Sequence, residues 1–324
     1  MLNEVASAIK KANTIVIMGH KNADGDSLCS MLAMGHFIKN EFGKEPMLVF
    51  EGVIPDNLRF LSSGWWLKKA ELVRDTVFDL AISLDTADTN SLNDADARTV
   101  FQNAKYKIKI DHHPKSKEEG DINILIETAA TCEILANGAK ELGWEITPQI
   151  ARFLYAGIHS DTGGFMHDYT SPATMRVIAD MMETKFDHTE IPRKFNEKQQ
   201  QTFINNAETL ARVLFTEDGK IAYATYSIRK NEEGERPHRQ TDWLHRQMGL
   251  VKDVQVTVIF KEMDDDRIQI SIRSRRNPIN TFAEHFGGGG HTLAAGLVMT
   301  GPIANVVAQL IPKLQGYVNA GFKF

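Results

Sequence analysis

Cysteine is scarce in this chain of 324 residues: Cys29 and Cys132 are far apart, and no Cys-x-x-Cys pair is present. This usage argues against a disulfide scaffold and a structural zinc site, and it indicates a reducing cytosol. No apolar run approaches the ~18 residues needed to span a bilayer. The run at 14–18 is also too short for the hydrophobic part of a secretory signal. We therefore expect a cytoplasmic protein without membrane association.

A basic surplus is also missing, since 37 Lys and Arg stand against 42 Asp and Glu, for a formal net charge of −5. Extended DNA binding is not expected, because it needs a broad basic face to neutralise phosphates. A small phosphorylated substrate in one pocket remains compatible with this balance. The hydrophobic fraction of 42% is ample for a folded core, and the length predicts two domains.

Short apolar runs alternate with helical patterns in the first part of the chain. Buried strands that alternate with helices predict a parallel sheet in an α/β architecture. In such sheets, ligands bind at the carboxyl ends of the strands. The expected strands are 14–18, 47–50, 77–84 and 106–110; the expected helices are one that begins at an N-cap Ser27, followed by 131–142, 148–158 and 173–182.

A polar segment at 184–201 predicts a linker or connecting helix, after which a second pattern begins. It predicts a smaller α/β domain with a mixed sheet. The expected elements are strands at 221–227, 254–260 and 267–271, a Gly-rich loop at 287–290, and a helix at 303–311 that Pro312 stops. The expected parts of the chain are a domain at 1–185, a linker or connecting helix at 186–208, and a domain at 209–324.

Asp and His residues follow four of the expected elements. They are His20, Asp24 and Asp26 after the first strand, Asp85 after 77–84, Asp111, His112 and His113 after 106–110, and Asp161 after the helix at 148–158. Asp24 and Asp26 are expected to project on one side of an extended loop. A polar turn with an Asx-type cap explains that loop alone equally well. The convergence of four elements on one sheet edge favours a binding site instead.

Carboxylate oxygens with a few imidazoles suit Mn²⁺, Mg²⁺ or Fe²⁺ better than a thiolate-selected zinc. So many ligands exceed the needs of one ion, which predicts a site for two divalent cations. Motifs of competing machinery are missing from the sequence: there is no GxxxxGK[ST], no GxSxG and no HExxH.

The motif Asp111-His112-His113, preceded by His20-x-x-x-Asp24-x-Asp26 and taken together with Asp85 and Asp161, resembles the DHH phosphoesterase superfamily. The resemblance implies two divalent cations, with Mn²⁺ as the expected ion and Mg²⁺ or Fe²⁺ as alternatives. It implies His20, Asp24 and Asp85 as ligands of one cation, and Asp26, Asp85, His112 and Asp161 as ligands of the other. By the same resemblance His113 faces the substrate phosphate and Asp111 orients the neighbouring histidines. We also expect Asp161 or His113 to move protons.

Four glycines at 287–290 precede His291, and Arg273 lies in the segment Ser271-Ile-Arg-Ser274. Consecutive glycines allow positive φ and can expose N–H groups that cradle an anion, although a flexible linker has the same composition. Together these residues resemble the DHH-associated C-terminal domain of the first type. That domain occurs in oligoribonucleases and relatives of the RecJ exonuclease, and it differs from the C-terminal domain of family II pyrophosphatases. The resemblance implies nucleotide contacts from Arg273, Gly288, Gly289, Gly290 and His291.

The chain looks most similar to the stand-alone bacterial nanoRNase and pAp phosphatase group. This implies metal-dependent hydrolysis of short RNA, from either end, and of pAp. The alternatives are a phosphodiesterase for cyclic di-AMP or the linear dinucleotides pApA and pGpG, a pyrophosphatase or exopolyphosphatase, and a nucleotide sensor without catalysis. A homodimer is left open. We expect Trp65 and Trp66 to serve packing, and the basic segment at 236–239 to be solvated.

Overall fold

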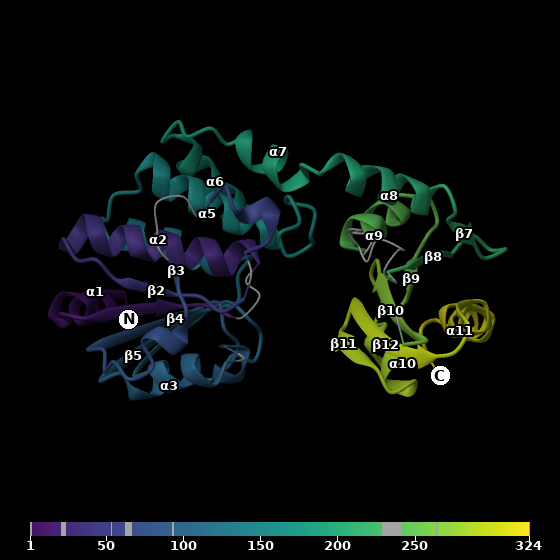
Figure 1. Ribbon diagram of the computed structural model, residues 1–324. Helices are drawn as coiled ribbons and strands as arrows, with labels where there is room; N and C mark the ends of the chain where they lie inside the picture. The colour runs from purple at the N-terminus through teal and green to yellow at the C-terminus, as the bar shows by residue number, and fades with distance from the viewer. Residues whose placement is uncertain are drawn as a thin grey trace. The chain divides into compact units, whose positions relative to one another are not determined.

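The computed structural model describes residues 2–20, 24–52, 54–61, 67–92, 94–228, 241–263 and 265–323, except for the side chain of His291. Trp65, Trp66 and the basic segment at 236–239 lie outside the described residues. The chain divides into two compact units, Met1–Glu197 and Lys198–Phe324, and each contains its own sheet (Figure 1).

The first unit is built on a six-stranded sheet in the order β3-β2-β1-β4-β5-β6, and its strand pairs are parallel. The predicted α/β fold with a parallel sheet is confirmed. The order reverses between β1 and β4, and such a switch point opens a crevice at the carboxyl ends of the strands. The strands are β1 (Ile15–Met18), β2 (Met47–Val49), β3 (Leu67–Lys68), β4 (Leu80–Leu84), β5 (Tyr106–Asp111) and β6 (Ile122–Leu125).

Helices cover both faces of this sheet, because alternate strand residues point to opposite sides. Ile15 and Ile17 of β1 join the core under α2 and α5, whereas Val16 and Met18 join the core under α3. Figure 1 shows α2 and α5 above the strands and α3 below them. The helices are α1 (Leu2–Lys11), α2 (Gly25–Phe42), α3 (Ala95–Asn103), α4 (Thr131–Leu142), α5 (Pro148–Asp161), α6 (Pro172–Met182) and α7 (Glu190–Asn196), with short 3-10 turns at Asp56–Leu58, Ala70–Leu72 and Thr89–Leu92.

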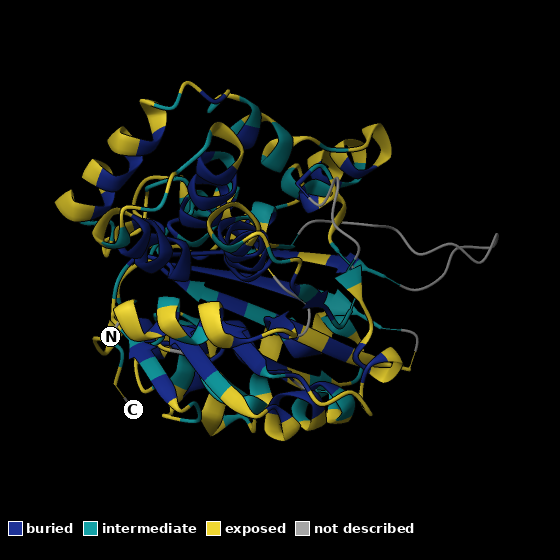
Figure 2. Ribbon diagram, turned by 90° about the vertical axis from the view of Figure 1, so that its left-hand side faces the viewer, coloured by how far each residue is buried: buried dark blue, intermediate teal, exposed yellow. Residues whose placement is uncertain are grey.

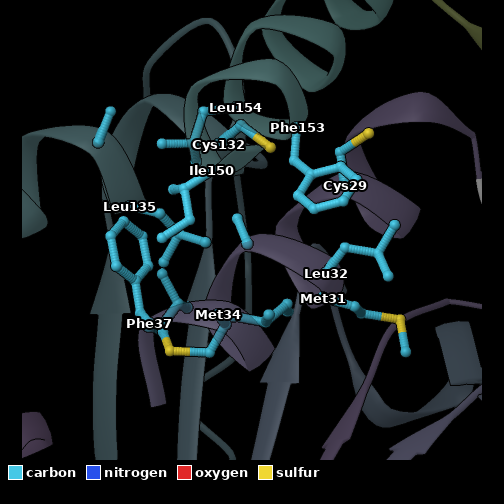
Figure 3. Packing of buried hydrophobic residues seen from close by; sticks show 14 of the residues in the cluster. Cys29, Met31, Leu32, Met34, Phe37, Cys132, Leu135, Ile150, Phe153 and Leu154 are labelled. Carbon is cyan, nitrogen blue, oxygen red and sulfur yellow. The ribbon is translucent and has the colours of Figure 1, made fainter. Parts of the chain in front are cut away.

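Helices α2, α4 and α5 pack closely in one cluster of buried side chains (Figure 3). Phe153 of α5 lies near Cys29 of α2 in this view, and Cys132 of α4 lies near Leu154. Both cysteines are free and buried. A Cβ at Gly157 of α5 would overlap the Cys132 sulfur and a carboxylate oxygen of Asp26, so only glycine allows α5 this close to both neighbours.

The second unit holds a mixed sheet in the order β11-β12-β10-β9-β8-β7, as the sequence predicts. Strands β8 and β9 are parallel, and the other pairs are antiparallel. One core lies between this sheet and α10 and α11, and another lies under α9. The elements are α8 (Gln200–Leu210), β7 (Leu214–Phe215), β8 (Ile221–Ser227), α9 (Thr241–Gly249), β9 (Val256–Glu262), β10 (Arg267–Ser274), α10 (Asn280–His285), β11 (Gly289–His291), β12 (Ala294–Thr300) and α11 (Ile303–Asn319).

The central strands β1 and β4 of the first sheet are buried along their length, whereas both residues of the edge strand β7 and the outer helix faces are exposed (Figure 2). One predicted boundary is wrong at Pro312, since α11 continues through it to Asn319. The buried side chains of Leu314, Tyr317 and Val318 follow the proline and join the core. Their burial outweighs the ~3 kcal/mol that an interior proline costs a helix. Among the described residues, no helix is both long and apolar enough to cross a membrane.

Candidate metal centre

Carboxylate and imidazole side chains gather where the strands of the first sheet end. They come from the β1–α2 loop, the ends of β4 and β5, and the last turn of α5. The structure brings together all the residues that the sequence predicts for this edge. They are His20, Asp24, Asp26, Asp85, Asp111, His112, His113 and Asp161.

Asp24 is the N-cap of α2, because its Oδ1 accepts hydrogen bonds from the amides of Asp26 at 3.0 Å and Ser27 at 3.1 Å. The predicted N-cap at Ser27 is therefore wrong. Asp26 lies in the first helical turn and is fully buried, whereas the Asp24 side chain is 51% exposed. The two carboxylates thus do not share one side of an extended loop, and each belongs to a different group of candidate ligands.

Asp85 follows β4 with a left-handed backbone, at φ 56°. This conformation is costly for a residue with a side chain, so the surroundings must hold it. The Asp85 amide donates to the Ile110 carbonyl at 3.0 Å, and Thr131 Oγ1 donates to Asp85 Oδ1 at 3.3 Å. The carboxylate consequently lies between two imidazoles, with Oδ2 3.5 Å from His20 Nε2 and Oδ1 3.5 Å from His112 Nε2.

Three groups of side chains place ligand atoms within 4.8 Å of one another, among the residues that the structure describes. The first is His20, Asp24 and Asp85; the second is Asp26, His112 and Asp161; the third is Asp85, His112 and His113. Asp85 and His112 each belong to two of them. Overlapping groups of hard oxygen and imidazole donors can hold divalent cations close together.

Backbone and side-chain contacts orient both histidines. Nδ1 of His112 is 3.1 Å from the Thr128 carbonyl, which turns Nε2 toward Asp161 Oδ2 at 3.1 Å. Within the described part of the chain, this buried Nε2 has no hydrogen bond of regular geometry, as suits an atom that binds a cation. His113 Nδ1 is hydrogen-bonded to Asp111 Oδ1 at 2.8 Å, so Asp111 orients the His113 ring.

The site crowds acidic groups in a buried place. Burial raises the pKa of Asp26 to about 7, with repulsion from Asp85 as the next cause, and it raises the pKa of Asp161 to about 6. Burial acts to lower the pKa of His112, but the contact with Asp161 and the negative charge of Asp26 outweigh it and raise this pKa to about 10. Perturbed groups of this kind cluster at functional sites, and bound cations relieve such repulsion between carboxylates.

Sequence patterns miss several residues that support this site. Ser27 Oγ accepts from the His20 amide at 3.1 Å. The amides of Thr131 and Cys132 donate to the Asp26 carboxylate at 2.6 and 3.0 Å. Asp26 thus accepts hydrogen bonds from amides in the first turn of α4, which have no partner within the helix. The one available signal is Ala130, an N-cap of α4 without a side-chain acceptor.

Lys109 is another supporting residue that the sequence patterns miss. It lies inside β5, is 1% exposed, and donates from Nζ to the carbonyls of Ala87 at 2.9 Å and Lys117 at 2.8 Å. It therefore ties the segment after Asp85 to the segment after His113. A lysine within the apolar pattern of residues 106–110 is the signal that could have found it.

In the second unit, Arg273 lies on β10 and donates to Asp242 Oδ1 at 3.0 Å and to Ser271 Oγ at 3.3 Å. Ser271 also contacts the buried His245, whose Nε2 lies 3.0 Å from Ser271 Oγ and whose Nδ1 lies 2.7 Å from Thr257 Oγ1. Burial lowers the pKa of His245 to about 3, which keeps the ring neutral. The guanidinium is thus held by a network that reaches into the core.

The glycine run has a different role in the structure from the one its composition suggests. A Cβ at Gly288 or Gly290 would overlap carbonyl oxygens of the neighbouring strand β12. The Gly288 amide donates to the Ala283 carbonyl at 2.8 Å at the end of α10. The expectation of a free N–H group is therefore wrong at Gly288. Gly289 pairs with Gly296, and the His291 side chain lies outside the described part.

Residues 14–158 match the model of the DHH family, N-terminal domain, and residues 247–320 match that of the DHHA1 domain. A probable bifunctional oligoribonuclease and PAP phosphatase NrnA of Streptococcus mutans is 28% identical over 90% of this chain and 91% of the relative. The bifunctional oligoribonuclease and PAP phosphatase NrnA of Bacillus subtilis is 26% identical over 91% of this chain and 92% of the relative.

A solved structure of an exopolyphosphatase-related protein from Bacteroides fragilis has the same fold, with a TM-score of 0.86 at 24% identity. The match covers 98% of this chain and 96% of that chain. The two family models together span about two thirds of the chain, in the order that the sequence motifs predict. The chain therefore contains a DHH family N-terminal domain, followed by a DHHA1 domain.

Proposed function

We propose that this protein is a metal-dependent hydrolase that cleaves phosphoester bonds in short oligoribonucleotides and in pAp. The observation that carries the proposal is the sharing of Asp85 and His112 between overlapping groups of candidate ligands. The names of the relatives from S. mutans and B. subtilis support the same substrate class. These relatives match 90% and 91% of this chain.

The donor set fits two divalent cations, with Mn²⁺ as the proposed ion. His20, Asp24 and Asp85 would hold one cation, and Asp26, Asp85, His112 and Asp161 would hold the other. The short contacts of Asp85 with His20 and His112 support its assignment as the shared ligand. The buried and crowded state of Asp26 and Asp161 supports the same assignment, because positive charge relieves their repulsion.

Bound cations of this kind polarise phosphoryl oxygens and lower the pKa of an attacking water. Asp111 would hold Nδ1 of His113 in a hydrogen bond, which leaves Nε2 of that ring to face a substrate phosphate. Asp161 or His113 would accept and return the proton. In the second unit, Arg273, Gly289, Gly290 and His291 would bind the nucleotide, and Gly288 would shape the backbone of that region.

A hydrolysis panel tests this proposal. The metal-free protein is loaded with Mn²⁺, Mg²⁺ or Fe²⁺ and given pAp, pApA, pGpG, a five-nucleotide RNA, cyclic di-AMP or pyrophosphate. We expect Mn²⁺-dependent release of nucleoside monophosphate from the short RNA and of AMP from pAp, with loss of both activities in EDTA. Fast cleavage of cyclic di-AMP with slow cleavage of RNA would favour the dinucleotide alternative. Cleavage of pyrophosphate alone would overturn the proposal.

A further inference from the structure

An exposed pair of aromatic rings follows the last candidate ligand of the metal centre. His167 and Tyr169 stack with their ring centroids 5.3 Å apart and an interplanar angle of 25°. Both side chains are exposed, and Tyr169 is 52% exposed. An exposed stacked pair leaves apolar surface in contact with water and contributes little to the core. Its position therefore calls for a functional explanation.

The segment that carries this pair has a fixed conformation. Gly163, Gly164 and Phe165 have consecutive positive φ values of 58°, 73° and 65°. The Phe165 amide donates to Thr162 Oγ1 at 3.0 Å, and the His167 amide donates to the Thr162 carbonyl at 3.1 Å. The His167 ring also lies against Gly163, where a Cβ would overlap its Nε2. The turn therefore presents the two rings in one defined place.

Tyr169 connects this turn directly to the metal centre. Its hydroxyl donates to the main-chain carbonyl of Asp161 at 2.7 Å, while Asp161 Oδ2 lies 3.1 Å from His112 Nε2. The stacked pair is therefore fixed to the same residue that offers a carboxylate to the cation groups. A nucleotide whose phosphate lies at those groups carries its base one ribose away from them.

We infer that His167 and Tyr169 form a stacking platform for the base of the nucleotide whose phosphate is cleaved. The inference rests on the proposed function and adds a subsite in the first unit to it. Imidazole and phenol rings stack on any base, at ~1–3 kcal/mol per base, so the platform favours nucleotides over other phosphate esters without selecting a sequence. This tolerance suits an enzyme that acts on short RNA of varied sequence.

Equilibrium binding tests the platform without requiring turnover. AMP and ribose 5-phosphate share a phosphate and a sugar, and only AMP has a base. Calorimetric titration of the Mn²⁺-loaded protein should show AMP binding ~10-fold more tightly than ribose 5-phosphate. His167→Ala and Tyr169→Ala should each reduce this preference about fivefold or more. An unchanged preference in both variants would overturn the inference.

Two further variants separate stacking from structural effects. Tyr169→Phe keeps the ring and loses the bond to Asp161, so it should retain most of the preference; a loss as large as that of Tyr169→Ala would contradict stacking. Tyr106→Ala removes a tyrosine that is 41% exposed at the start of β5, at the other end of the strands, and should change nothing. A loss of preference in this control would also contradict the platform.

Hydrolysis of pAp and of the five-nucleotide RNA by the wild-type protein reports separately on the proposed function. No hydrolysis, together with a base preference that depends on His167 and Tyr169, would refute the enzyme and keep the platform. Hydrolysis together with equal affinity for AMP and ribose 5-phosphate would refute the platform and keep the enzyme.

Discussion

Asp85 is buried, has a positive φ and lies within 3.5 Å of an imidazole nitrogen on either side. A hydrogen bond from its amide to the Ile110 carbonyl holds the strained backbone conformation, and its carboxylate accepts a hydrogen bond from the Thr131 hydroxyl. A carboxylate held in this way is prearranged for cations on both sides, because the cost of its conformation is met when the domain folds. The site should therefore be more sensitive to its charge than to that of any exposed acid.

Asp85→Asn tests this dependence with almost no change in shape. We expect hydrolysis of short RNA to fall by more than ~100-fold, because a neutral amide cannot serve both groups of ligands. The metal-free variant should be more stable than the metal-free wild type, because burial raises the pKa of Asp85. Thermal unfolding with and without Mn²⁺ measures both effects. Asp75→Asn, at an exposed acid, is the control; equal Mn²⁺ stabilisation in the Asp85 variant would contradict the model.

His245 predicts a pH dependence in the second unit. Its pKa of about 3 in the folded protein is below the usual value near 6.5, so the unfolded chain binds the proton more readily. The stability that this group contributes is complete above about pH 6.5 and is lost as the pH falls from there toward 3. Between pH 7 and pH 5 the loss should be about 2 kcal/mol for wild type. Urea unfolding at both pH values should show a smaller loss in His245→Gln, and an equal loss would refute the assignment.

The sequence predicts the charged residues of the site but not what holds them. His112 and Asp161 are visible because Asp and His after buried strands and helices are unusual. Ser27 holds the His20 amide, but in the sequence it looks like an ordinary helix cap. The sequence therefore favours Ser27 as the N-cap, although Asp24 is an equally good cap and takes that role. Lys109 bonds to carbonyls from two loops, and such backbone partners leave no trace in residue types.

At the scale of elements, the contact of α5 with α2 and α4 depends on Gly157. A methyl group there would meet Cys132 and the Asp26 carboxylate, so α5 would have to move away and carry Asp161 with it. Gly157→Ala should therefore destabilise the protein by ~1–3 kcal/mol and weaken Mn²⁺ binding, although alanine is the better helix former. Denaturant unfolding and Mn²⁺ titration measure the two effects.

Gly316→Ala is the matched control, because Gly316 lies in α11 and the described residues leave open space around its added methyl group. This variant should gain up to ~1 kcal/mol of stability. If both substitutions changed stability alike, the close packing around Gly157 would not be the cause.

Helices and strands with clear periodicity are predicted well, and those that depend on partners are not. The pattern at 131–142 predicts a helix with the bounds that α4 has, because its apolar face repeats at helical spacing. Strand β3 has two residues and exists because it pairs with β2. The stop at Pro312 was wrong because tertiary burial of the following turn exceeded a local preference.

The molecule consists of two units with separate cores. Residues such as Ile17 and Phe153 belong to the core of the first unit, and Phe260 and Leu310 belong to that of the second. The candidate cation ligands all come from the first unit, whereas Arg273 and the glycine run come from the second. The candidate cation ligands and the proposed nucleotide contact of Arg273 therefore rest on separate cores.

Calorimetric unfolding should show this independence as two transitions. Mn²⁺ at ~100 times its Kd should stabilise the first unit by ~2.7 kcal/mol and raise its transition by ~5–10 °C, with little effect on the second. Asp85→Asn should remove that shift, because a neutral amide cannot serve both groups of candidate ligands in the first unit. His245→Gln should move the other transition and leave the Mn²⁺ shift intact. A single transition that Mn²⁺ and both substitutions move together would show instead that the two cores unfold as one.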